Sequence, residues 1–208
     1  MSEHAHAAPA HDPHVGHATG GKVAMWIFIA QDGMAFGGLL LAYAILRFTA
    51  IEWPVPADVL GINLTAVATF ILILSSGSMV MAVDKAKRND QAGTCMWLAL
   101  TIVGGLSFLG IQAYEYTHLS HLGITLTTST WEGVPINDLF GSTFYLVTGF
   151  HGAHVTAGVI YLTCILIGAK RGKYTAGGIS NSPVELVGLF WHFVDLVWIL
   201  VFTFIYLL

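Results

Sequence analysis

The sequence predicts an all-α membrane protein: a bundle of five transmembrane helices with its amino terminus inside and its carboxyl terminus outside. Three observations predict this fold. The 208 residues are 55% hydrophobic and only 10% charged, whereas soluble proteins have about 25% charged residues. The apolar residues gather in five long segments, and the basic residues gather between alternate segments. The net charge of −4 is small and dispersed, which gives no indication of a nucleic-acid partner.

Each apolar segment is long enough to cross about 30 Å of hydrocarbon at about 1.5 Å per residue. We predict helices over residues 23–47, 59–83, 94–116, 139–168 and 184–207. The connecting stretches are polar and rich in turn-forming residues, and no internal repeat links the segments. Residues 22–208 are therefore predicted to form one five-helix membrane domain.

The orientation follows from the excess of lysine and arginine that cytoplasmic loops have. Three sets of basic residues fall on one side of the membrane: Lys22; Lys85, Lys87 and Arg88; Lys170, Arg171 and Lys173. The other side has Arg47 together with the acidic residues Glu52, Asp58, Glu115, Glu132 and Asp138. The basic side is predicted to be cytoplasmic.

Residues 1–21 are predicted to be a disordered, His-rich cytoplasmic tail. They lack the apolar core of a signal peptide, and they contain His4, His6, His11, His14 and His17. A His-rich tract can bind metal, but irregular spacing and intervening Ala, Pro and Gly favour a tail. His118 and His121 have no third ligand at a suitable spacing, so they are expected to be exposed residues of an outer loop over 117–138.

The fourth segment contains two histidines near its middle. His151 and His154 lie about 60° apart on a helix and share one face. Another face has the small residues Ser142, Gly149, Ala153 and Ala157, which would let a second helix approach closely in lipid. In the first segment Asp32 precedes Gly33 and Gly37, a spacing typical of close helix packing.

Ionisable residues on three helices are predicted to lie near one depth in the bilayer. From the helix rise, Asp32 is about 14 Å and His192 about 12 Å from the cytoplasmic end, and His151 is about 18 Å from the outer end. A lone charge at this depth is costly, so such groups are expected to be paired. We predict a hydrogen bond between Asp32 and His151. On the fifth helix, four residues share one face: Glu185, Gly188, His192 and Asp195.

Three sequence blocks resemble subunit III of the haem–copper terminal oxidases. They are GSTF and TGFHGAHV at 141–144 and 148–155, WHFVDLVW at 191–198 with Tyr206, and GIQAYEY with Gln112, Glu115 and Tyr116. The resemblance covers residues 23–208 and is to the short, five-helix form of the family. Asp32 stands where the family has glutamate.

This resemblance implies a non-redox accessory subunit of a respiratory oxidase, which reduces O2 to water and pumps protons. Such a subunit packs beside oxidase subunits I and II, binds phospholipid and supports proton uptake. Haem and copper are expected in the partner subunits, and no cofactor and no active site are expected in this chain. The resemblance implies the bacterial cytoplasmic membrane. The electron donor, cytochrome c or quinol, and membership of a supercomplex are left open.

Two other classes of protein remain to be weighed. In a membrane haem or metal protein for electron transfer, His151, His154 and His192 would ligate iron or copper. Di-metal sites in helix bundles require Glu-x-x-His on two helices, whereas this chain has His192-x-x-Asp195, in the reverse order. A secondary transporter with Asp32 in a proton relay would be expected to show repeated halves and broken helices, and the sequence shows neither.

Overall fold

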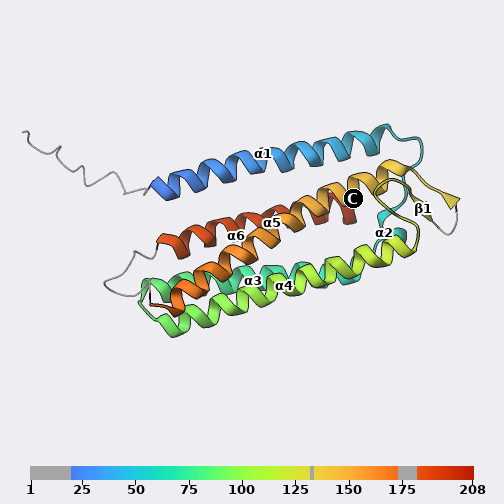
Figure 1. The fold of residues 1–208 in the computed structure, drawn as a ribbon. Coiled ribbons are helices and arrows are strands. Elements are labelled where there is room, and N and C mark those ends of the chain that lie inside the picture. Colours follow the sequence, from blue (N-terminus) through green and yellow to red (C-terminus); the bar gives the residue numbers. More distant parts are fainter. Residues whose placement is uncertain (1–19, 132–133, 173–181) are drawn as a thin grey trace, which may run out of the picture.

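The computed structural model describes residues 20–131, 134–172 and 182–208, and every structural statement below concerns these residues. The predicted disorder and location of the His-rich tail fall on residues 1–19, outside the described part of the chain. Figure 1 shows long helices running side by side, with short irregular segments at both ends of the bundle.

The five predicted transmembrane helices are confirmed as helices long and apolar enough to cross a membrane. They are α1 (Gly20–Thr49), α3 (Ile62–Lys87), α4 (Gln91–His121), α5 (Asp138–Lys170) and α6 (Ser182–Phe202), which continues into the π-helical turn η1 (Thr203–Leu207). A single turn, α2 (Pro56–Val59), lies between α1 and α3.

The segment after α3 turns sharply because Asn89 adopts a left-handed conformation with φ of 56°. Asp90 then caps α4, its side chain accepting a hydrogen bond of 2.9 Å from the backbone N–H of Gly93. Side-chain caps of this kind satisfy N–H groups that a helix start leaves unpaired. Asn137 caps α5 in the same way, accepting from Leu139.

The predicted outer loop is shorter than expected. Since α4 continues to His121, His118 and His121 lie in its last turn, so their assignment to a loop was wrong. The remaining connector contains a small antiparallel hairpin, β1 (Thr130–Trp131) with β2 (Val134–Pro135), which the sequence analysis did not predict.

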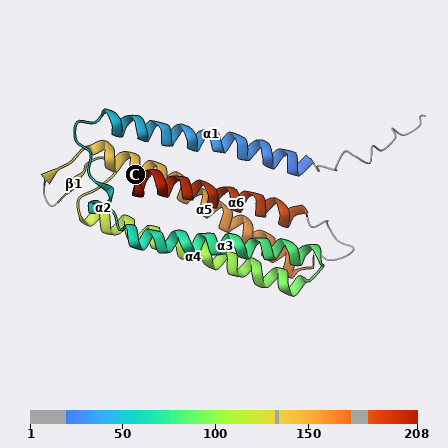
Figure 2. The same cartoon turned by 180° about the vertical axis from the view of Figure 1, so that it is seen from behind.

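The long helices lie in three successive positions across the bundle. In both views α3 and α4 lie at one side of the bundle, α5 and α6 in the middle, and α1 along the opposite edge (Figures 1 and 2). The start of α1, the α3–α4 turn, the end of α5 and the start of α6 lie at one end (Figures 1 and 2). These segments contain Lys22, Lys85, Lys87, Arg88, Lys170 and Arg171, whereas Lys173 lies outside the described residues. That this end faces the cytoplasm stays a prediction.

The closest helix contacts are made by glycines other than the predicted ones. An added Cβ would lie 2.6 Å from the Trp191 ring at Gly105 and 2.9 Å from it at Gly158, so the buried indole fits against the backbones of α4 and α5.

The small residues that were predicted to pack at helix crossings make looser contacts within this chain than Gly105 and Gly158 do. A Cβ on Gly33 would lie 3.8 Å from Phe193, one on Gly149 would lie 3.7 Å from Tyr116, and one on Gly37 would meet nothing within 4 Å. Ala153 and Ala157 are exposed. That these faces let another helix approach closely stays a prediction.

Candidate functional site

Asp32 pairs with His154, and the predicted partner, His151, was wrong. Nε2 of His154 lies 2.7 Å from Oδ2 of Asp32, and both side chains are about 15% exposed, at 15% and 14%. The approach is oblique, so the contact has the distance but not the alignment of a straight hydrogen bond. We describe it as a close polar pair linking α1 to α5.

The other ring nitrogen of His154 contacts the backbone of its own helix. Nδ1 lies 2.8 Å from the carbonyl oxygen of Phe150, and because a carbonyl only accepts, Nδ1 is the donor in this hydrogen bond. The His154 ring therefore links Asp32 on α1 to the backbone of α5.

His151 occupies a different environment, one turn before His154. Its side chain is fully buried, at 0% exposure, and neither ring nitrogen has a hydrogen-bond partner. The ring lies against Trp198 at 4.7 Å and against the edge of Phe108 at 5.6 Å between centroids. His151 thus packs as an aromatic ring in the core.

Glu115 joins three segments through its carboxylate. Oε1 accepts a hydrogen bond of 3.0 Å from Thr65 on α3, and Oε2 accepts one of 2.8 Å from Tyr206 in η1. Only 5% of Glu115 is exposed. A buried carboxylate without hydrogen bonds would be strongly destabilising, so these hydroxyls allow Glu115 to hold α3, α4 and η1 together.

The neighbouring residues of the same sequence block join α4 to α5. Gln112 donates to the carbonyl of Thr148 at 2.9 Å, and the hydroxyls of Tyr116 and Thr148 are 2.6 Å apart. All three polar residues of GIQAYEY that carried the family resemblance therefore form contacts between helices.

Side chains of α6 meet a row of hydroxyls on α3. Trp191 donates to Ser75 at 3.1 Å and Trp198 donates to Thr69 at 2.8 Å. Both indoles are buried. The α3 hydroxyls were not among the predicted site residues, although Thr65, Thr69 and Ser75 recur at helical spacing and could have indicated a polar seam.

The His192 side chain meets a hydroxyl of α3. The Oγ of Ser76 is 2.7 Å from Nδ1 of His192. Asp195 is 8% exposed and its Oδ1 has no partner. Asp32 and His192 therefore belong to separate contacts, on α1–α5 and α3–α6. That Asp32, His151 and His192 lie near one depth in the bilayer stays a prediction.

Glu185 lies at the end of the bundle that gathers the basic residues. Its carboxylate is 2.6 Å from Nζ of Lys22 and 3.2 Å from Nζ of Lys87, and its side chain is 22% exposed. Glu185 is therefore a partly exposed, ion-paired residue at a rim. With Gly188 and His192 it lines a cavity of about 510 Å³ between α1, α3 and α6.

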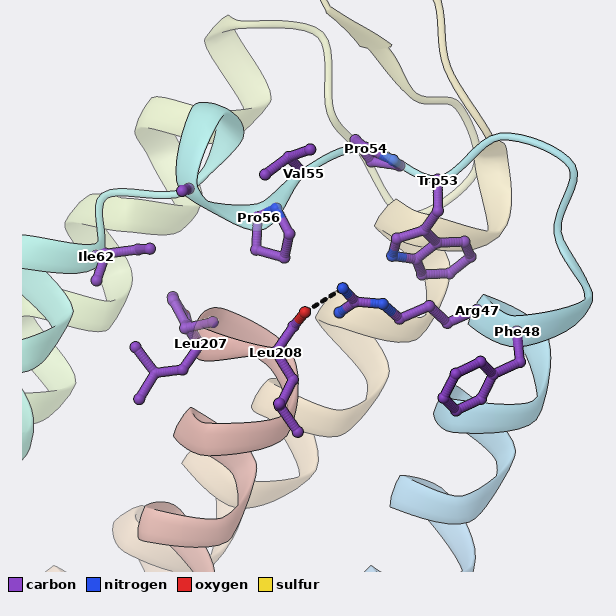
Figure 3. Close-up of a pocket in the computed structure, with 11 residues that line it drawn as sticks. Arg47, Phe48, Trp53, Pro54, Val55, Pro56, Ile62, Leu207 and Leu208 are labelled. Atoms are coloured by element: carbon purple, nitrogen blue, oxygen red, sulfur yellow. Dashed lines mark hydrogen bonds between the residues drawn. The ribbon is translucent and has the colours of Figure 1, made fainter.

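A second cavity, of about 380 Å³, lies at the opposite end of the molecule (Figure 3). It is lined by Arg47, Trp53 and Pro56 among other residues. The Arg47 guanidinium donates a hydrogen bond to the backbone carbonyl of Leu208. A cation at the carboxyl end of a helix is favourable because it meets unpaired carbonyls there, so this contact joins α1 to η1.

The described residues were also tested for metal coordination. Among residues 20–131, 134–172 and 182–208, no group of three or more His, Cys, Asp and Glu is placed to hold a metal ion. His154 faces a carboxylate, His192 faces a serine and His151 faces aromatic rings. The geometry thus favours interhelical contacts over the alternative of a haem or metal site.

Comparison with known proteins agrees with this description. The family model for cytochrome c oxidase subunit III matches residues 2–208. Quinol oxidase subunit 3 of Bacillus subtilis is 32% identical over 88% of this chain and 84% of that protein. Cytochrome c oxidase subunit 3 of Corynebacterium diphtheriae is 38% identical over 86% of this chain and 84% of that protein. This multi-pass membrane protein therefore belongs to the cytochrome c oxidase subunit III family.

Proposed function

We propose that this chain is a non-redox accessory subunit of a respiratory haem–copper oxidase in the bacterial cytoplasmic membrane. It binds beside subunits I and II, which hold the haem and copper, and it lengthens the working life of the oxygen-reducing centre. The observation that supports this role best is the arrangement of the polar residues in the blocks that resemble the family. Their side chains are engaged in contacts between helices, and none of the contacts described above forms a redox site.

The proposed role includes binding of phospholipid in the 510 Å³ cavity. Trp26, Val80 and Leu189 supply apolar walls suited to acyl chains, and Lys22 and Lys87 lie at the rim beside Glu185 and Asp84. A rim with both signs of charge suits a headgroup that contains a phosphate and an ammonium group. His192 and Glu185 also put protonatable groups at this end, which supports a contribution to proton uptake by the complex.

Purification of the intact complex through a tag on this chain tests the proposal. Subunits I and II should co-purify with haem absorption in the visible spectrum. Detergent removal of this chain should leave the spectrum of the remaining enzyme unchanged and shorten the time for which it keeps turning over. A tagged chain that is free of other subunits but retains one haem or copper per molecule would contradict the proposal.

Filling the cavity tests the lipid component separately. Leu189→Trp should lower the phospholipid that co-purifies with the complex, because the larger ring occupies the space of an acyl chain. Ile27→Trp is a matched control, since Ile27 is exposed at 63% and does not line the cavity. Equal lipid content in both variants would argue against this site.

A further inference from the structure

The cavity beside Arg47 has a cation that lacks an ion pair. The cavity has a volume of about 380 Å³, and none of the described residues that line it is acidic. Arg47 forms no salt bridge within the described part of the chain. It is also the one Lys or Arg of the sequence that is predicted to lie on the outer side, against the usual distribution of basic residues. A partly buried cation is stabilised by a nearby anion, so this position favours an anion from outside the chain.

Hydrogen-bond donors outnumber acceptors at this cavity. A guanidinium has five N–H groups, and within the described residues Arg47 contacts the Leu208 carbonyl and, at 3.5 Å, the Tyr43 hydroxyl. Its cap on Leu208 therefore leaves most of the guanidinium unengaged. The indole N–H of Trp53 is buried, and no acceptor for it lies in the described part of the chain. Because a buried donor without a partner is costly, this surplus favours an occupant rich in acceptors.

The two donor side chains are held by their neighbours. The Trp53 ring packs edge-on against Tyr43 and Phe140, with centroids 5.7 Å apart in both pairs. The contact with Leu208 orients the Arg47 guanidinium. Both side chains line the cavity, and in Figure 3 the nitrogen of the indole lies on the side of the ring nearer the guanidinium. Little conformational freedom would be lost when a ligand binds between such groups.

The surroundings of the cavity indicate which anion it takes. Phe48, Val55 and Leu207 give it apolar walls, and it lies at one end of helices that are long enough to cross a membrane. This end is therefore at the level of the lipid headgroups, where every phospholipid brings a phosphate group. A guanidinium binds phosphate through two parallel hydrogen bonds.

We infer that Arg47 and the indole N–H of Trp53 form a binding site for a phosphate group. The group belongs to a phospholipid headgroup or to free inorganic phosphate, since both present the same oxygens. The site is separate from the 510 Å³ cavity, with which it shares no lining residue, so it stands or falls independently of the proposed function.

Protection of Arg47 from phenylglyoxal, a reagent for guanidinium groups, tests the inference. The protein is purified with the subunits that accompany it and stripped of lipid, and modification of each arginine is followed by peptide mass spectrometry. Inorganic phosphate or dihexanoylphosphatidic acid should slow the reaction of Arg47 at least about fivefold, and saturably, because a phosphate-bound guanidinium is covered. Arg88, whose side chain is 72% exposed, should react at an unchanged rate at equal ionic strength.

Trp53→Phe keeps the aromatic ring and removes its N–H. It should raise the concentration that gives half-protection about three- to tenfold, the size of one hydrogen bond. Trp26→Phe is the matched control, because Trp26 is exposed and lies outside this cavity, and it should leave that concentration unchanged.

The two probes distinguish the sources of the phosphate group. Protection by inorganic phosphate shows that free phosphate is sufficient, and protection by the phosphatidic acid alone identifies a lipid headgroup; either result supports the site. Equal protection of Arg47 and Arg88, equal protection by neutral dihexanoylglycerol, or equal behaviour of the two tryptophan variants would overturn the inference. So would an Arg47 that is unreactive with and without a probe, since another subunit would then cover the cavity.

Discussion

Helices α1 and α6 are both long enough to cross a membrane, yet they are built into the molecule in different ways. The most apolar part of α1 has a mean hydropathy of 1.5 and is 17% buried, whereas that of α6 has 2.0 and is 56% buried. In lipid, apolar side chains gain little by leaving the acyl chains for a protein core. Close packing and hydrogen bonds therefore decide which helix lies at the centre.

The contacts of the two helices agree with this reasoning. Buried hydrogen bonds from Trp191 and Trp198 join α6 to α3, and the first of these indoles also fits against glycines of α4 and α5. By contrast, α1 is joined to the bundle by the partly exposed Asp32–His154 and Lys22–Glu185 contacts. We expect substitutions on α6 to affect stability, and those on α1 to affect assembly.

The largest effect is expected from Trp191→Ala. Removing this fully buried indole leaves a cavity and removes its hydrogen bond to Ser75, which should lower the free energy of unfolding by about 3–5 kcal/mol. Leu41→Ala on α1 is the control, since Leu41 is 62% exposed, and it should change stability by less than about 0.5 kcal/mol. Thermal unfolding of the detergent-solubilised complex measures both. Equal losses would remove the distinction between the helices.

A smaller loss of stability is expected from Tyr206→Phe. The change removes one donor to Glu115 and leaves a buried carboxylate oxygen unpaired, at a cost of about 1–3 kcal/mol. Tyr114→Phe should have no measurable effect, because Tyr114 is 61% exposed and makes no hydrogen bond through its hydroxyl among the described residues. Denaturant titration followed by tryptophan fluorescence compares them. A silent Tyr206→Phe would show that Thr65 alone satisfies Glu115.

Asp32→Ala should lower the free energy of unfolding by about 1 kcal/mol, which is the lower part of the range for a residue that loses its polar partner. The loss is small because His154 keeps its hydrogen bond to Phe150. Initial turnover of the oxidase should be unchanged and its working life shortened, as α1 loosens from α5. Asp58→Ala, at an exposed position, is the control. An Asp32→Ala enzyme that stops at once with every subunit bound would show a direct catalytic role.

The smallest effect concerns the turn between α3 and α4. The hydrogen bond from Gly93 and the contact with Lys85 hold the pKa of Asp90 below its ordinary value of 3.8. A group whose pKa is lowered by folding stabilises the protein above its unfolded pKa and loses that effect as pH falls through the folded pKa. Asp90→Asn should therefore lower the Tm slightly at pH 7, and the difference should shrink as the pH falls below 3.8 and disappear below the lower pKa of the folded state. A difference independent of pH would assign the effect to the cap geometry alone.

The sequence by itself determined the five helices, their approximate ends and the family. An apolar run long enough to cross the bilayer leaves the backbone no alternative to a helix, so hydropathy was sufficient to predict the five helices. The blocks of family resemblance also identified Gln112, Glu115 and Tyr116 as important positions. The end of α4 was missed because its last turn is polar, and polar residues at helix ends do not stop a helix by themselves.

Only the tertiary structure decided which polar groups meet. His151 and His154 are one turn apart on one face of α5, and depth arithmetic does not distinguish them. The rotation of α1 about its axis brings Asp32 to His154, while Phe108 and Trp198 from α4 and α6 enclose His151. Likewise, Trp191 could have faced lipid or protein, and it is buried because Gly105 and Gly158 leave room for its ring. Such choices depend on the shapes of several helices at once, which the spacing of residues along one helix does not contain.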